Sequence, residues 1–345
     1  MSHPPEGRPD LTSALRQVEV FLLGETPTLT RLQVAEQSGV APDVADELWR
    51  LLGFPHASDT DVAFTPGDVR AVGLAGDLMA LGVLSPERQS ALVRTWGRSF
   101  ARLAEWQTTL LADVALESGA DPTTQVADLA EQVLVRVEQL QDYVWRRHLA
   151  SAAGRLMTEA SGEVASALAV GFVDIVGFTS RSKELTETEL VGWIEGFEAT
   201  CTDIVLEHGG RVIKSIGDAV LYVADDLGGA IEAALAITEQ GASPDEQFPE
   251  VRAGVAYGDV VARLGDVFGP TVNIASRLTS LARPGSVLVD VGAHDHLTGH
   301  TGSPDEQHEH DPDGPYELRR LRRTSVKGYS RLRSWAVRRS RGAPS

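Results

Sequence analysis

At the centre of this sequence lies the stretch Gly171-Phe172-Val173-Asp174-Ile175-Val176-Gly177-Phe178-Thr179. The apolar run Ala165–Val173 predicts a buried strand, and the glycine-containing turn after it predicts the start of a helix. Asp174 is therefore expected where a strand ends beside a helix start. Such a junction offers a carboxylate to a hard cation and free backbone N–H groups to a phosphate.

A second carboxylate follows in the segment Lys214-Ser215-Ile216-Gly217-Asp218. Short β-rich runs overlap it and follow it, at Arg211–Ser215 and Ala219–Ala224, and together they predict a hairpin. Asp174 and Asp218 could then converge on neighbouring strands and bind two Mg²⁺ or Mn²⁺ ions. For either aspartate alone, a plain structural role at a strand end or in a turn is an equal alternative.

The rest of the C-terminal half alternates strands with helices. A capping box, Thr186-Glu187-Thr188-Glu189, opens a helix that ends near His208. The pattern predicts an α+β domain of ferredoxin-like type with hairpin extensions, behind an all-α N-terminal domain. Further helices are expected at Leu227–Glu239 and Thr271–Ala282, further strands at Val251–Tyr257, Ser286–Asp290, Tyr316–Leu321 and Ser334–Val337, and a solvated loop at Asp305–Asp313.

Length and composition narrow the class of protein. The chain has 345 residues, enough for two domains, and a formal net charge of -18, which disfavours a general affinity for nucleic acid or anionic membranes. The single cysteine, Cys201, excludes an internal disulfide framework, and its apolar helical stripe indicates core packing. Neither a leader peptide nor a membrane-spanning run is evident, so a cytoplasmic protein without membrane contact is expected. The expected organisation is a disordered N-terminus (1–10), a helical domain (11–145), a linker helix (146–164), the α+β domain (165–339) and a C-terminal tail (340–345).

Residues Thr30–Gly53 predict a helix, a turn and a second helix, a pattern that DNA-binding proteins also use. The second helix would carry Asp43, Asp46 and Glu47 against one arginine, Arg50. Repulsion from the phosphates of DNA disfavours that function. A packed helical scaffold is the preferred interpretation.

Further helix starts are predicted at Thr65-Pro66-Gly67-Asp68 and at Ser85-Pro86-Glu87. A long apolar seam then leads towards the α+β domain and ends near His148, whose imidazole can titrate near neutral pH. The seam could complete the N-terminal core or could form a rod that transmits motion between the domains. The sequence supports the two interpretations equally. Helical spacing predicts a core role for Trp96, Phe100, Leu103 and Trp106, and the seam comprises Val126, Ala130, Val133, Val137, Leu140 and Val144.

Two more features suggest phosphate chemistry. Asn273 and Arg277 are four residues apart in a predicted helix and therefore share a face. Arg277 could stabilise the excess charge of a phosphate transition state, and Asn273 could hold a ribose. Lys327 is a cation in a glycine turn. Each feature alone is common on protein surfaces without any catalytic role. The functional assignment therefore depends on their combination.

Together these residues resemble the catalytic domain of the class III nucleotidyl cyclases. The resemblance extends from Val170 to Val337, and its motifs at 172–179, 214–218, 266–269 and 272–278 occur in the family's order. It implies metal binding by Asp174, Asp218 and the neighbouring Ile175, base reading by Lys214 and Asp266, transition-state stabilisation by Asn273 and Arg277, and substrate contacts from Phe178, Thr179 and Lys327, with Arg263 as a further candidate.

The implied base-reading pair favours ATP over GTP. Lys214 can donate to adenine N1 and Asp266 can accept from the 6-amino group, a pattern that guanine would invert. The resemblance also implies a homodimer in which each of two composite sites takes its metal aspartates from one chain and its other residues from the partner. There the ribose 3′ hydroxyl would attack the α-phosphate and pyrophosphate would leave, with two Mg²⁺ or Mn²⁺ ions per site and no protein nucleophile.

The segment Gly258–Gly265 is shorter than the family's usual hairpin, which leaves the register of Asp266 open. The N-terminal half resembles the helical regulatory domain of some actinobacterial cyclases, which implies control of activity, in the direction of inhibition. Two competing functions are a catalytically inactive nucleotide-binding sensor and a DNA-binding regulator on a cyclase fold. A pH signal is a hypothesis, motivated by His148 and by the group His294, His296, His300, His308 and His310.

Overall fold

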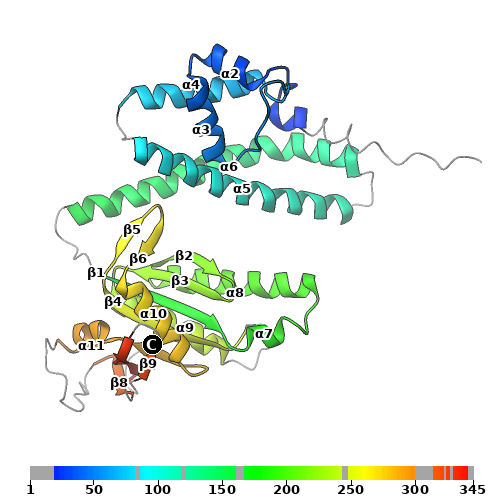
Figure 1. The fold of residues 1–345 in the computed structure, drawn as a ribbon. Coiled ribbons are helices and arrows are strands. Elements are labelled where there is room, and N and C mark those ends of the chain that lie inside the picture. The colour runs from blue at the N-terminus through cyan, green and yellow to red at the C-terminus, as the bar shows by residue number, and fades with distance from the viewer. Residues whose placement is uncertain are drawn as a thin grey trace, which may run out of the picture. The chain divides into compact units, whose positions relative to one another are not determined.

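A computed structural model of the chain describes residues 19–82, 86–117, 122–160, 167–242, 248–299, 314–321, 324–326 and 329–340. The chain divides into two compact units, Met1–Ala153 and Gly154–Ser345, which are described in turn (Figure 1). The expected disordered N-terminus, the expected loop at 305–313 and nearly all of the tail at 340–345 lie outside the described residues.

The first unit is built around helices whose ends follow local sequence signals. Thr30 and Gln33 form a capping box at the start of the helix Arg31–Ser38, and the N–H of Thr65 donates to Asp68 Oδ2 at 2.6 Å where the helix Pro66–Ala80 begins. A buried cluster that includes Val34, Leu48 and Val72 joins these helices. After a helical segment at residues 19–23, the helices are α2 (Arg31–Ser38), α3 (Pro42–Leu52), α4 (Pro66–Ala80), α5 (Pro86–Glu117) and α6 (Pro122–Ala160).

The aromatic residues of α5 do not form the core that their spacing predicts. Trp96, Phe100 and Trp106 are 37%, 58% and 56% exposed, so the prediction is wrong for them. The face of α5 that packs on α3 is a different one: Val93 is buried, and a Cβ on Gly97 would lie 2.4 Å from the carbonyl oxygen of Leu52. Helical spacing shows which residues share a face, whereas the partner of that face depends on the fold.

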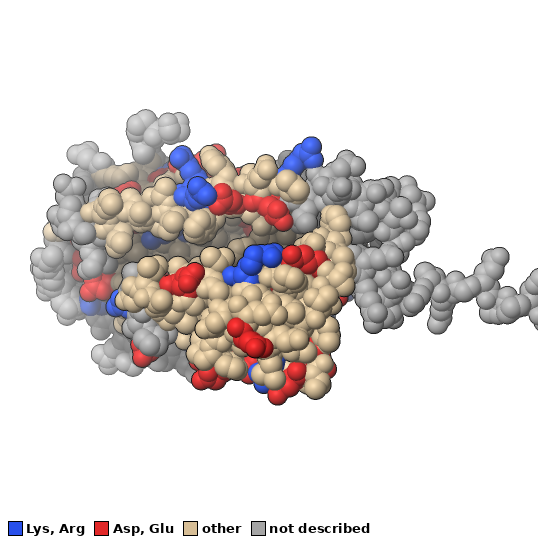
Figure 2. Space-filling view, turned by 90° about the horizontal axis from the view of Figure 1, so that it is seen from above, with Lys and Arg blue, Asp and Glu red and all other residues tan. Residues whose placement is uncertain are grey.

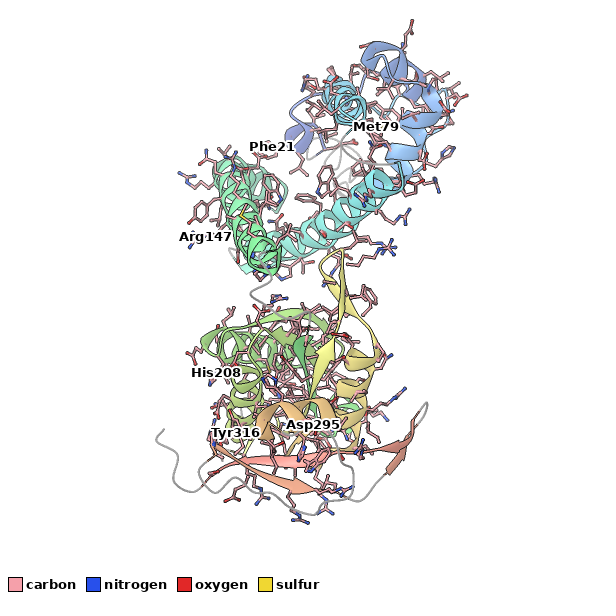
Figure 3. All side chains as sticks on the ribbon, turned by 90° about the vertical axis from the view of Figure 1, so that its left-hand side faces the viewer. Phe21, Met79, Arg147, His208, Asp295 and Tyr316 are labelled. Atoms are coloured by element: carbon pink, nitrogen blue, oxygen red, sulfur yellow. The ribbon has the colours of Figure 1, made fainter. Side chains whose placement is uncertain are left out.

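Helix α6 continues without a break through the division between the two units, which falls after Ala153. The expected linker helix at 146–164 belongs to this helix as far as Ala160, and its last residues lie outside the described part. Of the seam, Leu140 and Val144 are exposed. Arg147 projects from α6 with an exposed side chain (Figure 3).

The second unit contains a seven-stranded sheet in the order β2-β3-β1-β4-β7-β11-β8. Its first half is a β1-α8-β2-β3-α9-β4 unit with the strand order of a ferredoxin-like fold, so the predicted α+β class is confirmed. The strands are β1 (Ala167–Ile175), β2 (Gly210–Ile216), β3 (Ala219–Ala224), β4 (Val251–Asp259), β5 (Val261–Arg263), β6 (Asp266–Phe268), β7 (Val287–Val289), β8 (Tyr316–Arg320), β9 (Thr324–Val326), β10 (Tyr329–Leu332) and β11 (Trp335–Arg339). The helices are α7 (Phe178–Arg181), α8 (Glu187–Glu207), α9 (Leu227–Gly241), α10 (Pro270–Leu281) and α11 (Val291–Thr298).

The sheet buries a different set of side chains on each face. Ala169 and Val173 of β1 pack with residues of α8, α9 and α11, whereas Val170 and Phe172 pack with residues of α10. Cys201 is fully buried on the α8 side, as its position in the apolar stripe predicts. Because successive residues of a strand point to opposite faces, Asp174 belongs to the face that carries α10.

Candidate active site

Two carboxylates lie close together where β1 pairs with β3. Asp174 is opposite Ala219 in the ladder, and the N–H of Ile175 donates to the backbone carbonyl of Asp218 at 3.0 Å. Partial burial raises the pKa of the Asp174 carboxyl, an effect that Arg252 opposes and the nearby charge of Asp218 reinforces. The fold thus brings together two aspartates from distant parts of the sequence.

Arg252, which the sequence analysis did not single out, faces Asp174 from β4. The two residues are directly opposite in the ladder, and the Nε and Nη2 atoms of Arg252 donate to the same oxygen, Oδ2 of Asp174, at 2.8 and 2.5 Å. A third nitrogen, Nη1, donates to the carbonyl of Ser280 on α10 at 3.4 Å. An arginine inside the apolar first half of β4 is itself a signal that an acidic partner lies on a neighbouring strand.

The donor atoms here fit a hard divalent cation. The described residues contain no cluster of three or more histidine, cysteine, aspartate or glutamate side chains. A cation beside Asp174 and Asp218 would complete its shell from backbone carbonyls, such as that of Ile175, from water and from substrate phosphates. Mg²⁺ is commonly bound in that way, through one or two carboxylates.

Lys214 and Asp266 form an ion pair between β2 and β6. A β-bulge at Ile213 makes this possible: Val212 is opposite Tyr222, but Lys214 is opposite the next residue of β3, Leu221. Tyr222 packs on the α8 face and Leu221 on the α10 face. The extra residue therefore moves Lys214 to the face that carries Asp174.

The short segment before Asp266 forms a tight hairpin. Arg263 and Asp266 are paired across β5 and β6, and the two residues between them, Leu264 and Gly265, have φ values of 55° and 77°. Partial burial raises the pKa of the Asp266 carboxyl, but hydrogen bonds from Lys214 and from the Val267 N–H lower it, and the net shift is downward. The register that the sequence left open therefore places Asp266 against Lys214, while Arg263 lies exposed on β5.

Asn273 and Arg277 project from the same face of α10. Buried Ala275 and Leu278 hold the helix on the sheet, and the Thr279 hydroxyl donates to the Phe172 carbonyl of β1 at 3.3 Å. Within the described part of the chain, the side chains of Asn273 and Arg277 have no hydrogen-bond or ion-pair partner. An amide and a guanidinium are thus available to a ligand beside the sheet.

The predicted strand-to-helix turn is present after β1. Gly177 has a φ of 72° and precedes α7, a helix of four residues, at whose start the first N–H groups lack partners within the helix. Phe178 is half-buried and Thr179 is exposed. Lys327 lies outside the described residues.

Comparison with known proteins agrees with this fold and these motifs. Residues 161–333 match the family described as "Adenylate and Guanylate cyclase catalytic domain", and the chain belongs to this family, that of the class III nucleotidyl cyclases. It is 41% identical over 297 residues to an adenylate cyclase of Streptomyces coelicolor, covering 83% of this chain and 77% of that one. An adenylate cyclase of Glutamicibacter nicotianae is 37% identical over 309 residues (84% and 76%), and a "pH-sensitive adenylate cyclase" of Mycobacterium tuberculosis is 31% identical over 284 residues (78% and 70%).

None of the helices in the described part of the chain is long and apolar enough to span a bilayer.

Proposed function

We propose that this class III adenylate cyclase converts ATP to 3′,5′-cyclic AMP and pyrophosphate at two composite sites of a homodimer. Adenylate cyclase activity is supported by the named activity of relatives that match most of the chain. The observation that carries the proposed mechanism is the proximity of Asp174 and Asp218 where β1 pairs with β3, in a chain whose Lys214 and α10 lie on the same sheet face as Asp174. In the proposed composite site, the two aspartates of one chain would meet Lys214 and α10 of the partner chain around one nucleotide.

Asp174, Asp218 and the carbonyl of Ile175 would hold two Mg²⁺ or Mn²⁺ ions. When bound, the ions would lower the pKa of the 3′ hydroxyl and neutralise charge on the phosphates. Arg252 holds Oδ2 of Asp174 and leaves its other oxygen, Oδ1, for a ligand. Asp174→Asn is expected to lower cyclic AMP production about 100-fold or more, whereas the same change at exposed Asp203 is expected to leave it unchanged.

Lys214 and Asp266 would bind the adenine. In the free protein Lys214 and Asp266 are hydrogen-bonded to each other. Adenine would insert between them, with N1 as the acceptor for Lys214 and the 6-amino group as the donor to Asp266. The Asp266 carboxylate is already oriented, because its Oδ1 accepts a hydrogen bond from the Val267 N–H at 2.8 Å. Lys214→Glu is therefore expected to depress the use of ATP far more than the binding of Mn²⁺, and an equal loss of both would contradict this role.

Asn273 would hold the ribose and Arg277 would stabilise the negative charge that accumulates on the α-phosphate during attack. Phe178 and Thr179, at the start of α7, would contact the triphosphate, together with Lys327 and Arg263. Arg277→Ala is expected to lower kcat while leaving KM for ATP within about threefold, because an interaction made only in the transition state changes kcat.

Exposed apolar residues support the homodimer. Val261, Leu264 and Phe268, on the hairpin that carries Arg263 and Asp266, are 63%, 55% and 50% exposed. Apolar side chains gathered on a short hairpin are typical of an interaction site. A second copy of the chain is the partner that the composite site requires.

Complementation tests the shared sites directly. Asp174→Asn and Arg277→Ala chains are each expected to be inactive, but a mixture of the two is expected to recover activity, because half of the sites in a mixed dimer lack both substitutions. An inactive mixture that nevertheless forms mixed dimers would show that each site belongs to one chain. A purified protein that binds ATP and never yields cyclic AMP would instead indicate a nucleotide sensor.

The helical unit would regulate the catalytic unit, in the direction of inhibition, with pH as the proposed signal. A relative carries the description "pH-sensitive", and His148 lies exposed on α6 beside Arg147. Cyclisation of ATP and GTP by the full chain should be compared with that by a truncated chain that begins near Glu159, between about pH 5.5 and 8. A constant ratio of the two activities across this range would exclude pH control by the helical unit.

DNA binding has less support. On the face shown in Figure 2, the described acidic and basic side chains are interspersed, without a continuous basic stripe. On α3, Arg50 is paired with Glu47 at 3.7 Å. A gel shift at low salt would overturn this assessment.

A further inference from the structure

The turn that follows Asp174 is attached to the core through one side chain. At its base, the Val176 N–H donates to the carbonyl of Glu250 at 2.8 Å. Beyond that point Gly177, Thr179, Ser180 and Arg181 are exposed, whereas Phe178 is half-buried and packs against the core on the α8 face. The orientation of the turn therefore depends on what holds the ring of Phe178.

That ring is stacked on Trp193 of α8. The two ring centroids are 5.9 Å apart and the ring planes differ by 5°, the geometry of an offset stack. Tilting the ring of Phe178 would break this parallel contact, so the stack restrains the turn at its tip as the hydrogen bond of Val176 restrains it at its base.

Trp193 is half-buried and lies on a firmly anchored helix. It begins a stripe of residues four apart, Trp193, Phe197, Cys201 and Val205, of which the last three are at most 1% exposed. The start of α8 is fixed by the capping box of Thr186 and Glu189, in which the Thr186 N–H donates to Glu189 Oε2 at 2.8 Å. The tryptophan is thus attached to a helix that cannot shift without opening the core.

We propose that Trp193 is a positioning residue that holds the turn Gly177–Thr179 in the conformation in which Phe178 and Thr179 contact the triphosphate of ATP. The inference rests on the proposed function, since it assumes that Phe178 and Thr179 contact the triphosphate. A turn oriented before binding loses less conformational entropy when the nucleotide arrives. The contribution of Trp193 belongs to substrate binding, and the chemical step depends on other residues.

The test is a set of variants of the full chain on α8. Trp193→Leu removes the stack, and Trp193→Phe keeps an aromatic ring. Phe197→Leu is the matched control, because Phe197 lies one turn further along the same stripe and packs on Phe248, with ring centroids 5.7 Å apart. Trp193→Leu is expected to raise KM for ATP about two- to tenfold, the range of an aromatic pair, with kcat within about twofold. Trp193→Phe is expected to restore KM to within about twofold of the original value.

The control is expected to lower the unfolding temperature at least as much as Trp193→Leu while leaving KM unchanged. If Phe197→Leu raises KM as much as Trp193→Leu does, the effect is one of general stability and the inference is wrong. It is also wrong if Trp193→Leu leaves KM unchanged.

Two further measurements do not depend on turnover. The affinity for 3′-deoxy-ATP with Mg²⁺, measured by calorimetry, is expected to fall in Trp193→Leu by the same factor as KM rises. The tryptophan emission of the original protein is expected to change when this nucleotide binds, and the change is expected to disappear in Trp193→Phe. An active Asp174→Asn enzyme would refute the proposed function, whereas an inactive Asp174→Asn enzyme with unaltered Trp193→Leu binding would refute only the inference.

Discussion

The ring of Tyr222 lies directly over Gly171, its partner where β3 pairs with β1. A Cβ at position 171 would come within 2.1 Å of the Tyr222 Cζ atom, and Tyr222 is fully buried with its hydroxyl donating to the carbonyl of Ala230 at 2.7 Å. The ring cannot move aside without breaking that hydrogen bond. Position 171 therefore has no room for any side chain.

Gly171→Ala is expected to destabilise the catalytic unit by about 1–3 kcal/mol, the range for overpacked cores. The matched control is Gly196→Ala on α8, where nothing lies within 4 Å of the added Cβ, and there alanine is expected to stabilise by about 0.5–1 kcal/mol. Urea unfolding followed by circular dichroism measures both. Equal effects of the two changes would contradict the argument.

The Asp266 carboxyl gives the stability a defined pH dependence. Its pKa in the folded protein is below the ordinary value of 3.8, so its stabilising effect is present above that value and is lost as the pH falls through the folded-state pKa. Asp266→Asn is therefore expected to destabilise at pH 7, by at most about 1 kcal/mol because the pair is partly exposed. The difference between the two proteins is expected to shrink as the pH falls below 3.8 and to vanish once the pH is below the folded-state pKa, and a difference that does not shrink would show that the amide perturbs the hairpin by other means.

At the scale of elements, the sequence predicts what local rules determine. The capping box at Thr186 marks the start of α8, the hairpin of β2 and β3 surrounds Asp218, and the four-residue spacing places Asn273 beside Arg277. These features depend on neighbours along the chain, so their residue types are sufficient.

Features that depend on pairing between distant segments could not be predicted. The bulge at Ile213 that turns Lys214 towards the site depends on the register with β3, and the contact of Arg252 with Asp174 depends on the register with β4. The exposure of Trp96 and Phe100 depends on which face of α5 meets α3. Each of these is decided by packing partners that lie elsewhere in the sequence.

The β5–β6 hairpin contains a strained turn. Leu264 has a φ of 55°, a left-handed conformation that asparagine or glycine adopts at lower cost than leucine. Leu264→Asn is expected to stabilise the catalytic unit by about 0.5–1 kcal/mol, and Leu264→Ile to destabilise it, because a β-branched residue fits this conformation least well. Thermal unfolding at low protein concentration measures the two effects. A loss of stability in Leu264→Asn would show that the leucine side chain makes a contact that stabilises the protein by more than the strained backbone destabilises it.

At the scale of the whole molecule, each unit has its own buried core. Leu48 belongs to the cluster of the helical unit, whereas the two clusters of the catalytic unit lie between residues 169 and 337. Leu48→Ala is expected to destabilise the helical unit by about 2–5 kcal/mol. Limited proteolysis should then cut the helical unit first and leave a resistant catalytic fragment, and simultaneous loss of both would show that the units unfold together.

The two-sided packing of β1 has a consequence for how mutations are tolerated. Ala169, Gly171 and Val173 face one set of helices, while Val170, Phe172 and Asp174 face the helix that carries Asn273 and Arg277. A deep mutational scan of residues 169–174 should therefore show a periodicity of two. Substitutions at odd-numbered positions should reduce the amount of intact enzyme but leave the specific activity of the surviving molecules unchanged, whereas those at even-numbered positions should lower specific activity as well.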